Sequence, residues 1–124
     1  MKTYISWKQV NRFVNSVAHE YKDSNLPGVF GIPRGGLVLA VMLSHKLNIP
    51  MLMSPVPGCM IIDDICDSGE SLLHYVKNSS GATDNEYHIV TMFYKENQLN
   101  IIPENWGYPK SDKWIVFPWE CDES

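Results

Sequence analysis

The sequence lacks both the long apolar runs of a membrane protein and the paired cysteines of a disulfide-rich domain. Its longest uninterrupted apolar run, residues 37–43, is far shorter than the roughly 20 residues that span a bilayer. The N-terminus shows no apolar stretch typical of a signal peptide. Three cysteines are present, and none shows metal-ligand spacing. We therefore expect a soluble domain in a reducing cytoplasm.

Basic side chains are also scarce. Lysine and arginine number 10 against 14 aspartates and glutamates, so the formal net charge is −4, and only two arginines occur. A general nucleic-acid-binding protein needs a basic surface, and this composition argues against one. The 124 residues, of which 44% are hydrophobic, are enough to bury one core. Without repeats or linkers, residues 1–124 are predicted to form a single domain.

The apolar pattern alternates between strands and helices. A capping box at Ser6 and Gln9 opens an amphipathic helix over residues 7–21. The remaining apolar segments predict strands at 29–32, 59–62, 88–93 and 114–117, and helices at 37–47 and 70–77. The helix at 37–47 is apolar nearly all round and is therefore expected to be buried on all sides. The segments interpreted as loops are 63–69, 78–85 and 95–113. This order predicts an α/β fold with a mostly parallel, Rossmann-like central sheet and helices on both faces.

The most informative segment follows the strand at 59–62. Two adjacent carboxylates, Asp63 and Asp64, come directly after it, and Asp67-Ser68-Gly69-Glu70-Ser71 opens the next helix. Ligands bind beyond the carboxyl ends of parallel strands, and a helix start with hydroxyls and a glycine suits an anion. A phosphate there, with a diol and Mg²⁺ at the carboxylates, predicts a sugar phosphate. The alternative is a capped helix with a solvated acidic turn.

This segment resembles the phosphoribosyl pyrophosphate (PRPP) motif of the type I phosphoribosyltransferases. That motif is an apolar run, two acidic residues, a short spacer and Asp-Thr-Gly-x-Thr. Here Ile65 and Cys66 form the spacer, and Ser68 and Ser71 replace the threonines. Serine keeps the hydroxyl group that each position supplies. Cys66 is interpreted as a small spacer rather than as an activated thiolate.

A second loop, Pro33-Arg34-Gly35-Gly36, follows the strand at 29–32. Glycines let backbone N–H groups approach an anion closely, and Arg34 offers a fork of donors to phosphate oxygens. The loop resembles the pyrophosphate loop of the same family. The resemblance implies that Pro33, Arg34 and Gly35 bind pyrophosphate and that the Pro33–Arg34 peptide is cis. Taken alone, the loop is equally a tight turn with a surface arginine.

A third set of residues resembles the base site of the 6-oxopurine branch, most closely the small bacterial xanthine-guanine and hypoxanthine phosphoribosyltransferases. Lys95 follows the strand at 88–93, and Trp114-Ile115 begins the last apolar run. The resemblance implies that Lys95 meets the purine O6, that Trp114 stacks on the base, and that the Ile115 backbone reads its edge within a small C-terminal base-binding hood. The alternatives are an exposed lysine and a core tryptophan. Trp119 is interpreted as a packing residue.

The resemblance implies an enzyme that transfers the 5-phosphoribosyl group from PRPP to a 6-oxopurine and releases pyrophosphate. Asp67 would take up the purine proton, while Asp63 and Asp64 would bind the ribose diol. The one cofactor, Mg²⁺, would lie on Asp64, with Asp63 as a second candidate ligand. The 5′-phosphate would bind at the turn formed by Asp67, Ser68, Gly69, Glu70 and Ser71. The expected partners are PRPP and a purine base, in a cytoplasmic homodimer of purine salvage, with neither nucleic acid nor a membrane.

One family feature is missing from this sequence. Family members carry a long mobile loop between the second and third core strands, whereas residues 54–58 are all that separates two apolar segments here, and two of the five are prolines. So short a link cannot cross over between parallel strands, and 51–58 is therefore predicted to be an extended strip. The alternatives to an enzyme are a PRPP-binding module that has lost transfer and a flavodoxin-like phosphate-binding domain. If a partner chain supplies a cover, residues 96–113 are the candidate.

Overall fold

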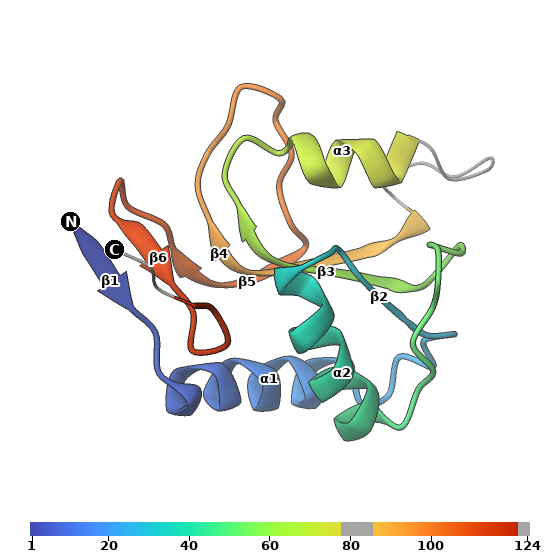
Figure 1. Cartoon of the computed structure of the whole chain (residues 1–124). Helices are drawn as coiled ribbons and strands as arrows, with labels where there is room; N and C mark the ends of the chain where they lie inside the picture. Colours follow the sequence, from blue (N-terminus) through green and yellow to red (C-terminus); the bar gives the residue numbers. More distant parts are fainter. Residues whose placement is uncertain (78–85, 122–124) are drawn as a thin grey trace.

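The computed structural model of the chain describes residues 1–77 and 86–121 (Figure 1). The loop predicted at 78–85 lies outside these ranges. In chain order, the elements are β1 (Lys2–Tyr4), α1 (Trp7–Tyr21), β2 (Val29–Gly31), α2 (Gly35–Leu47), β3 (Met60–Cys66), α3 (Glu70–Lys77), β4 (His88–Tyr94), β5 (Asn105–Pro109) and β6 (Trp114–Val116).

The centre of the molecule is a four-stranded sheet in the order β2-β3-β4-β5, and each neighbouring pair in it is parallel. Helices α1 and α2 lie on one face of this sheet, and α3 lies on the other (Figure 1). The predicted α/β architecture with a mostly parallel sheet is therefore confirmed. Because the strands point the same way, the segments that follow them open at one common edge, the carboxyl edge of the sheet.

Helix α1 begins at the predicted capping box. The Ser6 hydroxyl accepts a hydrogen bond from the Gln9 backbone N–H at 3.2 Å, and the Gln9 side chain accepts one from the Ser6 backbone N–H at 3.1 Å. These bonds satisfy donors that a helix start leaves without partners. The apolar stripe of the helix packs into the core that it shares with α2, burying Val10, Phe13, Val14, Val17 and Tyr21.

Helix α2 is less buried than its sequence predicts. Leu39, Ala40 and Leu43 are fully buried, but Leu37 and Val41 are exposed. The expectation of a helix buried on all sides is wrong, because α2 belongs to an outer layer and only one of its sides meets the sheet and α1. Of the helices within the described ranges, none combines the length and the apolar character that crossing a bilayer requires.

Strand β3 is longer than predicted. It continues through Cys66, so Asp63 and Asp64 lie within the strand, and the predicted loop at 63–69 is irregular only from residue 67 onward. The cause is pairing with β4, which continues as far as Cys66 beside Tyr94. Aspartate is depleted in strands, so the local sequence favours a loop, and the neighbouring strand decides otherwise.

Two short strands have no counterpart in the sequence-based prediction. β5 lies inside the stretch 95–113, which the sequence predicts to be irregular; it is an edge strand that contains Gly107 and ends at Pro109. Gly107 is required there, because a Cβ would come 2.7 Å from a ring carbon of Phe13.

β1 pairs in parallel with β6, and together they form a separate two-stranded sheet. This sheet joins both ends of the chain (Figure 1), and a base-binding role for it stays a prediction.

The link over residues 51–58 lies at the amino edge of the central sheet. Met51 forms an isolated parallel bridge with Val29, and no strand follows it. Val29 is also paired with Met60 in β3, so the link passes from one side of β2 to the other at the amino ends of these strands. The prediction that this segment does not form a full parallel strand is confirmed, but the segment is not extended throughout, because it turns at residues 57–58, where the Cys59 backbone N–H donates to the Val56 carbonyl at 3.1 Å.

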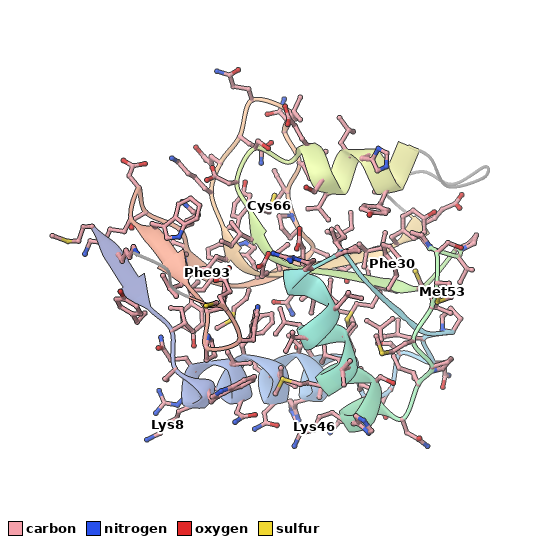
Figure 2. The ribbon with its side chains drawn as sticks, in the orientation of Figure 1. Lys8, Phe30, Lys46, Met53, Cys66 and Phe93 are labelled. Carbon is pink, nitrogen blue, oxygen red and sulfur yellow. The ribbon has the colours of Figure 1, made fainter. Side chains whose placement is uncertain are left out.

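Residues 54–58 are therefore remote from the carboxyl edge. Figure 2 shows Met53, which directly precedes them, at one end of the sheet, and Cys66, the last residue of β3, towards the other. Met53 is almost fully exposed, whereas Leu52 and Val56 pack against the apolar cluster on the α3 side of the sheet. A segment anchored at the amino edge cannot fold over a ligand bound at the carboxyl edge.

Candidate active site

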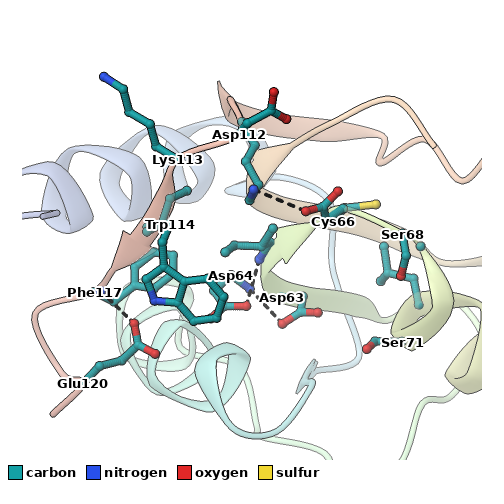
Figure 3. Close-up of a pocket in the computed structure, with 16 residues that line it drawn as sticks. Asp63, Asp64, Cys66, Ser68, Ser71, Asp112, Lys113, Trp114, Phe117 and Glu120 are labelled. Atoms are coloured by element: carbon teal, nitrogen blue, oxygen red, sulfur yellow. Dashed lines mark hydrogen bonds and ion pairs between the residues drawn. The ribbon is translucent and has the colours of Figure 1, made fainter. Parts of the chain in front are cut away.

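Two neighbouring hollows open at the carboxyl edge of the sheet. The first, the β3 cavity, has a volume of about 500 Å³ and lies between the end of β3, the start of α3 and the segment that leads into β6. In Figure 3, Trp114 faces Asp63 and Asp64 across this cavity, with Ser68 and Ser71 on the far side. The lining residues that the PRPP motif predicts are Asp63, Asp64, Asp67, Ser68, Gly69 and Ser71.

Asp63 and Asp64 form a carboxylate pair in the middle of β3, two residues before its end at Cys66. Asp63 is 6% exposed, and its Oδ1 accepts a hydrogen bond from the Asp64 backbone N–H at 2.8 Å. Asp64 Oδ1 accepts one from the Ile65 backbone N–H at 2.8 Å. Burial, and after it the Asp64 charge, raise the pKa of Asp63 to about 9, and burial also raises the pKa of Asp64. A cation beside such a pair would favour its charged form.

The donor set of this pair fits a magnesium ion. Mg²⁺ takes oxygen ligands and is usually held by one or two carboxylates together with substrate phosphates and water. Within residues 1–77 and 86–121, no three His, Cys, Asp or Glu side chains gather into a site that could hold a metal alone. An ion on Asp63 and Asp64 would therefore complete its coordination with oxygens of a bound ligand.

The turn between β3 and α3 supplies hydroxyls and backbone N–H groups to the cavity. The Ser68 hydroxyl accepts a hydrogen bond from the Glu70 backbone N–H at 3.2 Å. Gly69 has a φ of +83°, a conformation that favours glycine. Asp67, Ser68 and Ser71 line the β3 cavity, whereas the side chain of Glu70 is exposed and does not. Any ligand contact of Glu70 would therefore come from its backbone.

The stretch 96–113 is part of the wall of this site. Asn97 donates from its side chain to the Ile101 carbonyl at 2.8 Å and accepts from the Ile101 N–H at 3.0 Å, which closes a small loop. A Cβ on Gly69 would come 3.0 Å from Ile101, so this loop presses against the turn before α3. This contact places part of the stretch against its own chain, and its role as a cover for a partner chain stays a prediction.

The Pro33-Arg34-Gly35-Gly36 loop joins β2 to α2, and its Pro33–Arg34 peptide is cis, as the resemblance implies. Gly35 packs so closely on Asp64 that a Cβ at this position would overlap the carboxylate.

The second hollow, the Arg34 cavity, has a volume of about 840 Å³ and is lined by Arg34, Gly35, Val38, Asp64, Trp119, Glu120 and Cys121. Pro33 does not line it. Asp64 and Glu120 line both cavities, so the two meet between these carboxylates.

Trp114 and Ile115 both line the β3 cavity. Trp114 is 69% exposed, which rules out the alternative of a core tryptophan. Ile115 is buried, and its backbone is paired with Thr3 of β1. Trp119 stacks on Phe117 with ring centroids 4.7 Å apart, in agreement with its predicted packing role.

Lys95 lies at the end of β4 but does not line the β3 cavity. Its side chain is 41% exposed, and Nζ donates a hydrogen bond to Asp112 Oδ1 at 2.8 Å. This hydrogen bond, reinforced by the opposite charges, raises the pKa of Lys95 and lowers that of Asp112. Asp112 itself is a lining residue, so the Lys95 ammonium stands at the rim.

Sequence reasoning missed Lys110. This residue directly follows β5, and its Nζ lies 3.2 Å from Asp67 Oδ2 inside the β3 cavity. It belongs to none of the three family motifs. Its only signal is its position after a strand, and that strand is itself absent from the sequence-based prediction.

Cys66 is a buried thiol next to the site. Burial, followed by the charges of Asp63 and Asp67, raises the pKa of Cys66 to about 11. A thiol with this pKa remains protonated at neutral pH and is a poor nucleophile. The interpretation of Cys66 as a spacer is supported, and the activated thiolate is not.

The fold of the chain is similar to that of purine phosphoribosyltransferases of known structure, although no model of a protein family matches the chain. The chain is 24% identical to the xanthine-guanine phosphoribosyltransferase of Chromohalobacter salexigens over 141 aligned positions, which cover 94% of this chain and 82% of that protein. It is 25% identical to the xanthine-guanine phosphoribosyltransferase of Desulfotalea psychrophila, with 98% and 88% covered. A purine phosphoribosyltransferase from Pyrococcus horikoshii has a crystal structure that matches with a TM-score of 0.85 and 26% identity, covering 99% of this chain and 97% of that one.

These matches confirm the resemblance to the type I phosphoribosyltransferases, and the relatives found by sequence are xanthine-guanine phosphoribosyltransferases. They extend over nearly the whole chain. The 141 aligned positions exceed the 124 residues of this chain, so these relatives contain segments that the chain lacks.

Proposed function

We propose that this chain transfers the 5-phosphoribosyl group of PRPP to a 6-oxopurine base and releases pyrophosphate. The observation that carries the proposal is the meeting of the two cavities at Asp64. One cavity presents the 67–71 turn and Trp114, and the other presents Arg34. A ribose phosphate bound in the first therefore directs its pyrophosphate into the second. The names of the sequence relatives support the same reaction.

PRPP is held by three groups of residues in this proposal. The 5′-phosphate binds the N-terminus of α3 through the hydroxyls and backbone N–H groups of Asp67, Ser68, Gly69, Glu70 and Ser71. The ribose diol donates hydrogen bonds to Asp63 and Asp64. Pyrophosphate binds the Arg34 guanidinium and the Gly35 backbone, while Pro33 shapes the loop without lining the cavity.

Magnesium is the proposed cofactor, with Asp64 as its ligand and Asp63 as the second candidate. The buried carboxylate pair favours a cation, and Asp64 faces both cavities. An ion bound there would supply positive charge for the departing pyrophosphate. The protein itself contributes the rigid placement of the two carboxylates within a central strand.

The purine lies against Trp114 in this proposal. Trp114 provides an exposed aromatic face at the cavity wall, and the Ile115 backbone lies beside it to read the edge of the base. The resemblance gives Lys95 the role of meeting the purine O6, for which its ammonium must leave Asp112. Lys110 is a second lysine at the same edge.

The chemical step follows from these positions. The bond between ribose C1 and the pyrophosphate oxygen breaks, a bond between C1 and a purine nitrogen forms, and the proton on purine N7 passes to Asp67. Positive charge develops on the sugar, so the protein acts mainly by positioning and by electrostatic stabilisation. Asp67 precedes α3, whose N-terminal dipole favours a carboxylate that can accept the proton.

A PRPP-binding module without transfer is the second candidate function. The position of residues 54–58 at the amino edge favours it, because this link cannot exclude water from the site. The presence of Trp114 in the cavity counts against it, since a module that binds only PRPP needs no platform for a base. Relatives named as transferases also favour the enzyme.

The proposed setting is purine salvage in the cytoplasm, with the chain acting as a homodimer. The free thiols suit a reducing compartment. The substrates are small molecules, and neither nucleic acid nor a membrane takes part.

The test is an assay of the purified chain with PRPP, Mg²⁺ and guanine, xanthine or hypoxanthine, in which nucleotide and pyrophosphate are measured separately. Equal amounts of both products indicate transfer, and pyrophosphate alone indicates hydrolysis of PRPP in an uncovered site. Binding of PRPP without either product supports the module. Arg34→Ala is expected to weaken PRPP binding, and Arg12→Ala, which removes the chain's other arginine from the exposed side of α1, is the matched control.

A further inference from the structure

The 67–71 turn, which binds the 5′-phosphate in the proposed function, is covered from behind by the loop at 97–101. Within the turn, only Gly69 is buried. The atoms that a Cβ on Gly69 would meet first, at 3.0–3.1 Å, all belong to Asn97 and Ile101. In Figure 1, this loop lies between β4 and β5, beside the segment that leads from β3 to α3. The place of the turn therefore depends on a second loop, distant in sequence.

Asn97 closes the 97–101 loop with its side chain. Its amide group donates to the Ile101 carbonyl at 2.8 Å, and its Oδ1 accepts from the Ile101 backbone N–H at 3.0 Å. The Asn97 backbone carbonyl accepts from the Asn100 N–H at 3.2 Å, and Asn100 has a φ of +55°, which asparagine tolerates. An amide suits this pairing because it carries a donor and an acceptor side by side.

The closed loop is anchored to the sheet as well as to the turn. The Lys95 backbone N–H donates to the Cys66 carbonyl at 2.9 Å, which continues the pairing of β4 with β3 up to the loop. The Asn97 amide group also donates to the Cys66 sulfur at 3.8 Å. Ile101 packs on the apolar cluster on the α3 side of the sheet. The loop is therefore a fixed support against which Gly69 rests.

The position of this support matters for a phosphate site built from backbone N–H groups. Such groups cannot swing towards a ligand as a long side chain can, so a shift of the turn misaligns all of them together. Neither Asn97 nor Ile101 lines the β3 cavity. The loop can therefore influence a bound phosphate only through the turn.

We propose that Asn97 is a positioning residue for the phosphate-binding turn: by closing the 97–101 loop, it holds Gly69 and the neighbouring N–H groups where the 5′-phosphate of PRPP binds. This inference rests on the proposed function and deepens it. Because Asn97 acts through the turn, its loss weakens the contacts with the 5′-phosphate and leaves those at Arg34 and Trp114 intact.

The test compares two small ligands that report on different parts of the site. Ribose 5-phosphate binds at the turn, and pyrophosphate with Mg²⁺ binds in the Arg34 cavity. We expect Asn97→Ala to weaken ribose 5-phosphate binding roughly ten- to hundredfold, as for the loss of one hydrogen bond to a charged group. Pyrophosphate affinity should stay within about a factor of two, because its contacts lie on another loop. In steady-state kinetics, the PRPP KM should rise while the purine KM stays unchanged.

Gln98→Ala is the matched control. Gln98 is the next residue of the same loop and also carries an amide, but it is exposed. Its removal should leave both affinities unchanged. Hydrogen exchange in the free chain gives a direct readout of position: Asn97→Ala should speed backbone exchange at 67–71 and leave exchange at 33–36 unchanged, whereas Gln98→Ala should alter neither.

A second variant covers the case in which Asn97→Ala does not fold. Asn97→Ser keeps a hydroxyl that can donate or accept, but it is too short to bridge both backbone groups of Ile101. We expect it to weaken ribose 5-phosphate binding without changing pyrophosphate binding. The assignment is overturned by an unchanged ribose 5-phosphate affinity in a folded Asn97 variant, or by an equal loss for both ligands. If the unaltered chain binds neither ribose 5-phosphate nor PRPP, the proposed function fails and this inference falls with it.

Discussion

Asp67 is the residue on which the proposed transfer depends most directly. It lines the β3 cavity, precedes α3, and is held by Lys110 at 3.2 Å. We expect Asp67→Asn to lower kcat by ~10²- to 10⁴-fold, the usual contribution of a positioned proton transfer. PRPP affinity should change far less, because asparagine keeps the size of the side chain and an oxygen for Lys110. Steady-state kinetics and PRPP titration on one preparation provide the comparison.

Glu96→Gln is a suitable control for Asp67→Asn, because it removes an exposed carboxylate at the same edge that does not line the cavity. It should leave kcat and PRPP affinity unchanged. Equal losses of rate and PRPP affinity in Asp67→Asn would instead indicate that Asp67 binds PRPP and does not accept the proton.

Trp114 offers a separate test at the same scale. Its indole is largely exposed and lines the cavity, so truncation should leave the fold intact. We expect Trp114→Ala to raise the purine KM roughly ten- to hundredfold, as for the loss of one base–aromatic stack. The PRPP KM should stay within about a factor of three, because the PRPP contacts lie on other loops. Initial rates measured with each substrate varied in turn give both constants.

Trp106→Ala is the matched control for Trp114→Ala. Trp106 is also exposed, but it lies on β5 against Tyr94 and does not line the cavity. Its removal should leave both KM values unchanged. A similar rise in purine KM for the two variants would show that the effect of Trp114 is a general loss of packing.

At the scale of elements, the start of α2 and the end of β3 are packed without spare room. Gly35 adjoins Asp64 so closely that a Cβ would overlap its carboxylate. We expect Gly35→Ala to lower the free energy of unfolding by about 1–3 kcal/mol, the usual cost of overpacking. It should also displace Asp64 and thereby abolish the Mg²⁺ dependence of PRPP binding. Denaturant unfolding and PRPP titration with and without Mg²⁺ measure the two effects.

Val38→Ala serves as the control for this element contact. Val38 lies one turn further along α2 and lines the Arg34 cavity, but the change removes atoms instead of adding one. It should leave the Mg²⁺ dependence of PRPP binding intact. If Gly35→Ala binds PRPP with the original Mg²⁺ dependence, then Asp64 does not need its present position to hold the ion.

At the scale of the whole molecule, the ligand edge and the link at 54–58 lie at opposite ends of the strands. We expect PRPP with Mg²⁺ to slow backbone hydrogen exchange at 67–71 and 33–36, where phosphate groups bind. Exchange at 54–58 should not change, because the link cannot reach the ligand. Hydrogen exchange followed by mass spectrometry, with and without PRPP, resolves these peptides. Slower exchange at 54–58 on binding would reveal a rearrangement that brings the link over the site.

Sequence alone determined the features that depend on neighbours along the chain. The capping box at Ser6 fixes where α1 begins, because both partners lie within one turn. The apolar runs of β2 to β4 identify the central strands. The acidic pair and the 67–71 turn are only two residues apart in the sequence, so their place where β3 leads into α3 could be predicted without knowing the sheet order, but the continuation of β3 through the pair could not.

Tertiary structure decided the features that depend on distant partners. β3 extends to Cys66 because β4 runs beside it, and β5 forms, despite Gly107 and Pro109, because β4 offers an open edge. For the same reason, the sequence could not distinguish Lys95 from Lys110. Both are lysines near the end of a strand, and only the pairing of β5 with β4 turns one towards Asp67 and leaves the other at the rim. A local pattern specifies an element, but the direction in which its last side chain points is set by the strands packed beside it.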